Sequence, residues 1–291
     1  MNTGCCSGRG TAARKPRCRR KKTARRSSAG RLSTTLIWRS NSMRTTVFAK
    51  TSNVERFLAG ITEVEKRGAA EACLMLVEGK PGLGKTMVAR WWAVQQGAIY
   101  LRAKTTWTPN RALANLITEL GGSPSRFNSD LFNDALALMA RDETPPAVVL
   151  DEVEHTLHDS KVLETFRDLS DLLEFPLILI GMEGIGRRLD RHEQISSRIA
   201  RRVKFEPATP EDTALCVKEK AEVAMAEDLV AELHRLSKGK IRSVLNGIAL
   251  VENIARRNGW KEVKLADLRG LELIHDWRAM RPGLVNRNGK K

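Results

Sequence analysis

The stretch GKPGLGKT, Gly79 to Thr86, decides the fold of this chain. It follows an apolar run, ACLMLV, at residues 72–77, and it precedes a segment of helical character, MVARWWAVQQ, at residues 87–96. A strand, a glycine-rich loop and a helix in this order are typical of a phosphate-binding loop. Glycines let the loop backbone curl with its N–H groups inward, where the helix dipole also favours phosphate. The stretch therefore predicts a nucleotide site.

The residues of this loop have separate expected roles. Lys85 is expected to bridge the β- and γ-phosphates of ATP, and the Thr86 hydroxyl is expected to hold Mg²⁺. The alternative is a glycine-rich turn that only joins a strand to a helix, but such a turn needs no lysine followed by threonine. The loop residues predicted to contact the nucleotide are Gly79, Pro81, Gly82, Leu83, Gly84, Lys85, Thr86 and Met87.

A later apolar segment, PAVVLDE, ends in two carboxylates. Asp151 is expected to hold the Mg²⁺ shell together with Thr86, and Glu152 is expected to orient and activate the attacking water. The spacing of about 65 residues from the phosphate loop favours these roles over a chance pair of acids. The alternative is an N-cap of the next helix, which Glu154 or Asp159 could supply instead.

Composition limits the class of protein. With 291 residues, of which 42% are hydrophobic, the chain can bury one substantial core and a smaller lobe. No apolar run approaches the roughly 18 residues that span a bilayer, so we expect a soluble protein with no membrane partner. The five cysteines show neither C-x-x-C pairs nor metal-ligand spacing, which favours free thiols in a reducing cytoplasm.

The net charge of +16 is concentrated at the N-terminus. Residues 1–42 hold 12 of the Lys and Arg residues and no acid, which leaves 38 basic and 34 acidic residues for the rest of the chain. Residues 1–50 are predicted to be a basic, disordered extension, which can bind DNA through phosphate charge alone. The alternatives are an upstream segment without a role, since Met43 begins a different composition, and an organelle targeting sequence.

Strands and helices alternate over residues 51–207, which predicts an α/β core with a parallel five-stranded sheet flanked by helices. The predicted strands are residues 72–77, 98–101, 146–152, 177–181 and 202–205. The predicted helices of the core are residues 51–68, 87–96, 108–121, 129–141 and 161–174. The alternation then stops, and a small all-helical lid is predicted over residues 208–275, before a basic tail at residues 276–291. Its helices are predicted at residues 211–222, 228–237, 240–257 and 265–274.

Five segments together resemble those of an AAA+ ATPase: GKPGLGKT, VVLDE, LILIG, SSRIARR and SKGKIRSVLNG. Many P-loop proteins share the first two, so the S-R-I segment and the G-x-x-R of the lid make the resemblance specific. More narrowly, the run from LILIGMEG through LDRHEQISSRIARR is similar to the phage Mu transposition protein B group of target-selection ATPases. The resemblance covers about Val54 to Leu273.

The resemblance implies roles for two arginines. Arg198, in SSRI, matches an arginine finger that reaches the γ-phosphate held by the neighbouring subunit. Arg242, in GKIR, matches a second sensor arginine that contacts nucleotide from the lid. A planar, permanently charged guanidinium suits both roles, because it can bind two phosphate oxygens at once. The alternatives are a surface cation for Arg198 and a solvated arginine for Arg242.

Two features depart from the pattern of this family. A polar residue usually follows the fourth strand and positions the attacking water, whereas Met182 stands here, and a thioether is a poor hydrogen-bond partner. Slow hydrolysis is therefore expected, and the alternative is that the register of the match is off by one residue. Residues 1–50 also lack the apolar periodicity of the helix-turn-helix domain that begins the Mu protein, so DNA contact is expected from the ATPase core.

The resemblance implies that an ATP-dependent helical filament or ring encloses duplex DNA, with inner loops on the phosphates. Contact with the DNA backbone needs cations and hydroxyls rather than base-reading groups, and the loop RAKTTWTPNR offers both. The alternative is that Trp107 packs under the sheet while the charges are solvated. The predicted DNA contacts are Lys104, Thr105, Thr106, Trp107 and Arg111.

The expected function is a slow ATPase, stimulated by DNA and a partner, that assembles on duplex DNA with little sequence preference. It is expected to deliver this DNA to a transposase in the cytoplasm of a bacterial host. The expected catalytic residues are Glu152, Lys85 and Arg198, with Arg198 acting in trans. The alternatives are a helicase-loader ATPase of DNA replication, a small-molecule P-loop kinase, and a static DNA-binding protein that never turns its nucleotide over.

Overall fold

The structure is a computed structural model, and it describes residues 44, 47–66, 68, 73–125, 130–141 and 143–274. The basic tail predicted at residues 276–291, and most of the extension predicted at residues 1–50, lie outside this part of the chain. The α/β core and the helical lobe that follows it belong to one compact unit, Asn41–Lys291.

The core is built on one sheet of five parallel strands, in the order β2-β3-β4-β1-β5. The strands are β1 (Leu74–Gly79), β2 (Ile99–Arg102), β3 (Val148–Asp151), β4 (Leu177–Met182) and β5 (Ile199–Lys204). The central strands are nearly continuous apolar runs, because helices cover both faces of a parallel sheet. The predicted sheet is confirmed, and β5 begins three residues before the predicted residue 202.

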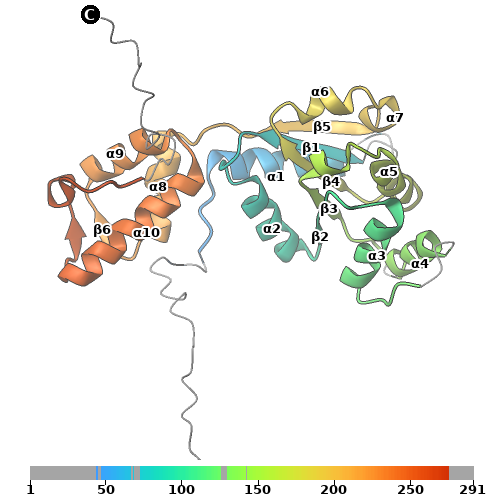
Figure 1. Cartoon of the computed structure of the whole chain (residues 1–291), viewed down its shortest axis with the longest axis horizontal. Helices are drawn as coiled ribbons and strands as arrows, with labels where there is room; N and C mark the ends of the chain where they lie inside the picture. Colours follow the sequence, from blue (N-terminus) through green and yellow to red (C-terminus); the bar gives the residue numbers. More distant parts are fainter. Residues whose placement is uncertain are drawn as a thin grey trace, which may run out of the picture. The chain divides into compact units, whose positions relative to one another are not determined.

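Helices cover both faces of this sheet (Figure 1). They are α1 (Ser52–Glu65), α2 (Lys85–Gln96), α3 (Pro109–Glu119), α4 (Leu131–Met139), α5 (Lys161–Leu173), α6 (Ile185–Leu189) and α7 (Glu193–Ser196). The side chains of α1 and α2 form one buried cluster, which Met75 and Val77 of β1 enter. The side chains of α3, α4 and α5 form a second cluster, which Leu74 and Leu76 enter from the opposite face of the same strand. The core is therefore a three-layer α/β/α arrangement.

The turn from β1 into α2 depends on glycine at two positions. A Cβ atom on Gly79 would lie 2.8 Å from the backbone oxygen of Phe205, so the chain after β5 can approach this point only beside a glycine. Gly84 has a φ of +94°, in the left-handed region that other residues rarely adopt, and α2 begins at the next residue. The fold itself therefore requires two of the glycines in the phosphate-loop motif.

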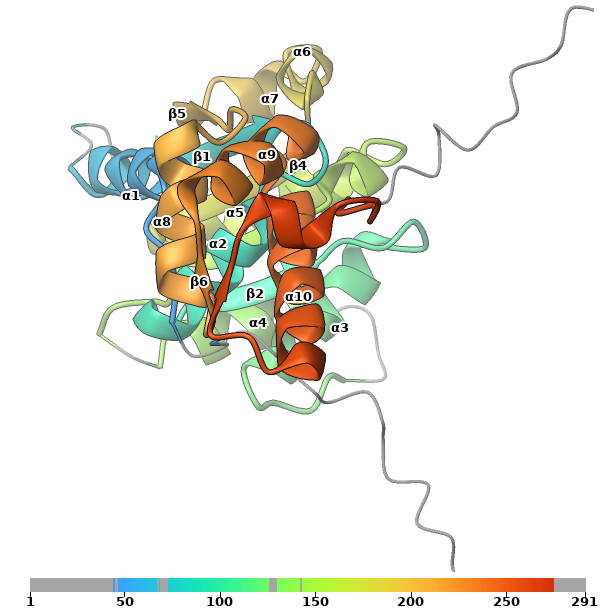
Figure 2. The same cartoon turned by 90° about the vertical axis from the view of Figure 1, so that its left-hand side faces the viewer.

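The lobe that follows the core contains three of the predicted helices (Figure 2). They are α8 (Pro210–Lys220), α9 (Glu227–Ser237) and α10 (Ile241–Asn258). Thr209 and Asp212 cap the start of α8 reciprocally, and proline occupies its first position. Buried residues of α8 and α10, such as Val217 and Ile248, form one apolar cluster of the lobe.

The end of the lobe differs from the prediction. The helix predicted at residues 265–274 is wrong, because the chain makes only one 3-10 turn there, η2 (Leu265–Leu268). The Asp267 carboxylate accepts a hydrogen bond from the Lys264 N–H at 2.8 Å and closes this turn. Just before it, β7 (Glu262–Val263) pairs in parallel with β6 (Ala224–Met225), so the lobe also carries two short strands that the sequence did not predict.

The folded body begins before the predicted boundary at residue 50. The Phe48 ring stacks on Trp91 of α2, with ring centroids 4.3 Å apart. Ala49 is buried in the apolar cluster of α8 and α10. These two residues therefore belong to the core and the lobe rather than to a disordered extension. The basic composition of the residues before them led to a predicted boundary that was too late in the chain.

Two described cysteines, Cys73 and Cys216, are buried and form no disulfide. Within the described part of the chain, no helix has the length and apolar character needed to cross a membrane.

Candidate functional site

The predicted nucleotide residues meet at the carboxyl edge of the sheet, where parallel strands open into loops. β1 leads into the loop at residues 80–84, β3 ends at Asp151, and β4 ends at Met182, which lies opposite Gly79 in the register of the two strands. A cavity of about 680 Å³ opens at this edge. The predicted nucleotide residues that line it are Pro81, Gly82, Gly84, Lys85, Thr86, Met87, Asp151 and Arg242.

The Lys85 ammonium lies inside the loop. Its Nζ donates hydrogen bonds to the backbone oxygens of Gly79 at 2.6 Å and Lys80 at 3.0 Å. Burial lowers the pKa of Lys85, and the carboxylates of Asp151 and Glu154 act in the opposite direction. Phosphate oxygens could replace the two carbonyl oxygens as acceptors, which fits the role predicted for this lysine. Two predicted contacts, Gly79 and Leu83, do not line the cavity. The Leu83 side chain lies in the core, so only its backbone can face a nucleotide.

The structure brings together the two residues predicted to hold Mg²⁺. The Thr86 hydroxyl donates to Oδ2 of Asp151 at 2.7 Å, and the Asp151 side chain is buried. With its hydrogen committed to the carboxylate, the hydroxyl oxygen keeps its lone pairs for a cation. A hydroxyl beside a carboxylate is an oxygen donor set that suits Mg²⁺. The residues present therefore fit the ion.

Glu152 lies at this edge but is held by an arginine. Its backbone is left-handed, with a φ of +58°, and its carboxylate is one-third exposed. Nε and Nη2 of Arg102, at the end of β2, donate to its two oxygens at 2.7 and 2.5 Å. The Arg102 guanidinium lowers the pKa of Glu152, since it favours the charged carboxylate. Both carboxylate oxygens of the predicted base thus accept hydrogen bonds from the same guanidinium.

Arg242 lies beside the phosphate loop, as predicted. Its backbone N–H donates to the Gly82 oxygen at 3.1 Å, and its side chain lines the cavity from the start of α10. The lobe thus brings a guanidinium to the candidate site. Its contact with a nucleotide stays a prediction.

Arg198 lies at the opposite edge of the sheet. Its backbone oxygen accepts a hydrogen bond from Leu74 at the start of β1, whereas the phosphate loop follows Gly79 at the end of that strand. Five steps of about 3.3 Å separate the two ends by roughly 16 Å, which is further than an arginine side chain reaches. Its Nε contacts Oδ2 of Asp171 at 3.2 Å. Arg198 therefore cannot serve the site of its own subunit, and its role in trans stays a prediction.

Met182 stands where a polar residue was expected. It ends β4, lines the cavity, and is 47% exposed. The sheet register aligns it with Gly79, at the entry to the phosphate loop. The thioether is therefore at the nucleotide site, and slow hydrolysis stays a prediction.

Three further residues, which the motifs did not identify, line or support the site. Glu154 lines the cavity, and its Oε2 is buried without a hydrogen-bond partner among the described residues. Tyr100 of β2 donates its hydroxyl hydrogen to Asp151, and Arg90 of α2 lies over the Tyr100 ring. Glu154 could have been identified from the sequence, because it is an acidic residue only three positions after Asp151. The contact of Tyr100 with Asp151 depends on β2 lying beside β3, and that of Arg90 depends on α2 packing against β2. The sequence did not determine either arrangement.

The loop predicted to contact DNA leaves the same edge of the sheet. The Ala103 N–H donates to the Asp151 backbone oxygen at 2.8 Å, and a turn follows in which Trp107 N–H donates to the Lys104 oxygen. Lys104, Thr105, Thr106 and Arg111 are exposed, as backbone contacts to DNA would require.

Trp107 corrects the prediction for this loop. Its side chain is 2% exposed and lies in the core cluster, with its ring 6.4 Å from that of Phe166. A buried ring cannot contact DNA, so the alternative interpretation of this residue holds. An exposed Trp107 that contacts DNA and a buried Trp107 that packs in the core fit the sequence of this loop equally well. The sequence alone therefore could not distinguish the two interpretations.

We expect Trp107→Ala to lower the free energy of unfolding by about 3–5 kcal/mol, because it removes a large buried ring from the core. We expect Lys104→Ala, three residues earlier and exposed, to change it by less than about 0.5 kcal/mol. Urea unfolding followed by circular dichroism measures both. If Trp107→Ala instead weakened DNA binding and left the stability unchanged, the ring would be a DNA contact after all.

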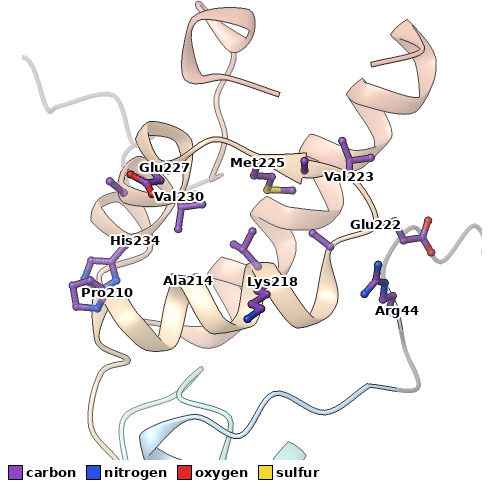
Figure 3. A pocket seen from close by; sticks show the side chains of 14 residues that line it. Arg44, Pro210, Ala214, Lys218, Glu222, Val223, Met225, Glu227, Val230 and His234 are labelled. Atoms are coloured by element: carbon purple, nitrogen blue, oxygen red, sulfur yellow. The ribbon is translucent and has the colours of Figure 1, made fainter. Parts of the chain in front are cut away.

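A second cavity, of about 790 Å³, lies within the lobe (Figure 3). Small apolar residues of α8 and α9, such as Ala214 and Val230, line it, with Arg44 and Glu222 at one end and His234 near the other. It contains neither a phosphate-binding loop nor any residue predicted from the motifs. The smaller cavity at the sheet edge is therefore the candidate site.

Comparison with known proteins agrees with this geometry. The AAA domain family matches residues 69–189. The chain is similar to the Aeropyrum pernix Orc1 protein in its complex with DNA, with 18% identity, a TM-score of 0.55, and coverage of 72% of this chain and 61% of that one. It is also similar to Cdc6p from Pyrobaculum aerophilum, with 14% identity, a TM-score of 0.52, and coverage of 72% and 62%. No curated protein matches the chain.

These findings establish the fold. Residues 69–189 match the AAA domain family, and the predicted AAA+ P-loop fold is confirmed. The chain spans less than two thirds of the length of the Orc1 and Cdc6p chains. None of these matches is specific to the phage Mu transposition protein B group, so the narrower resemblance stays a prediction.

Proposed function

We propose that this chain is an ATP-dependent AAA+ ATPase that assembles on duplex DNA through contacts that are largely independent of sequence. The observation that carries the proposal is the direct connection between the nucleotide edge and the exposed basic loop. Ala103 is hydrogen-bonded to Asp151, and Arg102 is bound to Glu152, immediately before Lys104. A movement of this loop on DNA would therefore reach the Glu152 carboxylate and the backbone of Asp151.

The residues of the cavity at the carboxyl edge of the sheet are consistent with ATP as the ligand. Lys85 would hold the β- and γ-phosphates, and Arg242 would reach them from the lobe. Mg²⁺, held by Thr86 and the shell around Asp151, would neutralise phosphate charge when bound. Glu152, once free of Arg102, would accept the proton of the attacking water.

The position of Arg198 supports self-association. This arginine lies at the edge of the sheet away from its own phosphate loop, and we propose that it completes the site of a neighbouring subunit. Such a contact joins two different surfaces, so it can repeat into an open filament or close into a ring. ATP at the joint would favour the assembled state, and hydrolysis would release it.

Two partners are consistent with such an assembly. The sequence resemblance to target-selection ATPases supports a transposase that receives the DNA. The similarity in fold to Orc1 bound to DNA and to Cdc6p supports a second candidate function, a helicase-loader type of ATPase in DNA replication. Co-purification with a transposase or with a helicase separates the two.

The test is binding to random-sequence duplex DNA with ATP, with ADP and without nucleotide, over a series of salt concentrations. We expect tight, salt-sensitive binding only with ATP. Lys104→Ala should reduce the slope of log affinity against log salt by about 1, since one phosphate contact is lost. Lys66→Ala, at the end of α1 on the other face of the sheet, is the matched control. Equal binding in every nucleotide state would contradict the proposal and assign DNA binding to residues 1–42.

A further inference from the structure

Tyr100 is the only tyrosine of the chain, and its hydroxyl contacts the predicted metal-binding carboxylate. It lies in the middle of β2, beside β3, and its OH donates to Oδ2 of Asp151 at 2.6 Å. The ring is partly buried against the cluster beneath α1 and α2. No sequence motif of a phosphate-binding loop includes this position.

The hydrogen bonds of Asp151 account for the orientation of its carboxylate. Oδ2 accepts from the hydroxyls of Thr86, at 2.7 Å, and Tyr100. Oδ1 accepts from the Glu152 N–H at 2.9 Å. Thr86 comes from α2 and Tyr100 from β2, so two donors on different elements converge on one oxygen. Rotation of the carboxylate would break both bonds, and its plane is therefore fixed before any ligand binds.

Tyr100 is itself held from the other side. The Arg90 guanidinium of α2 lies 5.0 Å from the centroid of the ring, within the range of a cation–π contact. Burial raises the pKa of Tyr100 strongly, and the Asp151 carboxylate raises it further. Both effects favour the neutral phenol, which is the form that donates to Asp151.

We propose that Tyr100 is a positioning residue, which holds the Asp151 carboxylate in the orientation that Mg²⁺ binding requires. The proposal rests on the nucleotide site proposed above. Groups that hydrogen-bond a metal-binding side chain, without touching the metal, typically change metal affinity by about 10- to 100-fold when removed. Tyr100 occupies this position with respect to Asp151, and Arg90 fixes the ring from which it acts.

The alternative is a purely structural role, in which the hydroxyl only ties β2 to β3. The backbone pairing of β2 with β3 already joins the strands over four residue pairs, from Ile99 with Val148 to Arg102 with Asp151. A structural role would make nucleotide binding weaker to the same degree with and without metal. A positioning role would affect only the binding that depends on the metal.

The experiment compares the full chain with Tyr100→Phe, which removes one oxygen and keeps the ring. Binding of a fluorescent ATP analogue is titrated in EDTA and then against Mg²⁺. We expect Tyr100→Phe to need about 10- to 100-fold more Mg²⁺ for half-maximal effect, with binding in EDTA unchanged. Thr118→Val is the matched control, because it removes an exposed hydroxyl that bonds only within α3. Unchanged Mg²⁺ dependence, or equal weakening with and without Mg²⁺, would overturn the proposal.

Binding by the wild type tests the premise of the proposal. Failure of wild type to bind the ATP analogue under any condition would contradict the proposed nucleotide site rather than the role of Tyr100.

Discussion

Replacing Lys85 with alanine is expected to lower the rate of ATP hydrolysis by about 100- to 1000-fold, the usual loss when one charged donor at a developing anion is removed. The loop holds the Lys85 ammonium by its own carbonyl oxygens, those of Gly79 and Lys80. Alanine leaves those oxygens facing the site with no positive charge between them and a triphosphate. Nucleotide affinity and ATP-dependent DNA binding should be lost together. Phosphate release and fluorescence titration with an ATP analogue measure the two effects.

Lys80→Ala is the matched control for this prediction. Lys80 belongs to the same loop, but its side chain is exposed and lies in a different cavity, beside Glu183 and Lys204. We expect this variant to retain nucleotide binding and hydrolysis. If both variants behaved alike, the effect would come from the net charge of the loop, and if Lys85→Ala bound ATP normally, the predicted site would be wrong.

The parts of the fold that the sequence predicted are those with local causes. The strand, glycine loop and helix around Gly84 follow from neighbouring residues, and so does the capped start of α8 at Thr209. The pairing of Thr86 with Asp151 is distant in sequence, but the spacing of the two motifs indicated it, and the structure brings the two oxygens to 2.7 Å. Local signals and the spacing of the two motifs were therefore enough to predict the phosphate loop and the pairing of Thr86 with Asp151.

What the sequence did not predict depends on the order of the strands. Tyr100 and Arg102 reach Asp151 and Glu152 because β2 lies beside β3 in the sheet. No pattern within β2 indicates its neighbour, so both contacts were missed. The prediction that Trp107 contacts DNA was wrong for a related reason. The composition of its loop fits both an exposed aromatic residue and one that points back into the core.

Replacing Glu152 with glutamine is the second prediction of large effect. A positioned general base typically contributes about 100- to 10,000-fold to a rate, and we expect hydrolysis to fall by that factor. Glutamine has nearly the same shape, and Lys85, Thr86 and Asp151 are untouched, so ATP binding should persist. The variant should remain on DNA with ATP, since release needs hydrolysis. Phosphate release and the lifetime of the DNA complex are measured together, and rapid turnover by Glu152→Gln would assign the base to another carboxylate, with Glu154 the first to examine.

The same contact predicts the opposite effect for Arg102→Ala. In the structure both oxygens of Glu152 accept hydrogen bonds from Arg102, which lowers the pKa of the carboxyl group and makes it a weaker base for water. The Arg102 side chain is largely exposed, and ion pairs open to solvent are weak, so we expect basal hydrolysis to rise by a small factor and its stimulation by DNA to fall. Arg235→Ala is the control, because Arg235 makes the same two-pronged contact with Glu232 on the surface of α9, at 2.7 and 2.6 Å. If Arg102→Ala instead lowered basal hydrolysis and Arg235→Ala did not, the guanidinium would support the active position of Glu152 rather than restrain it.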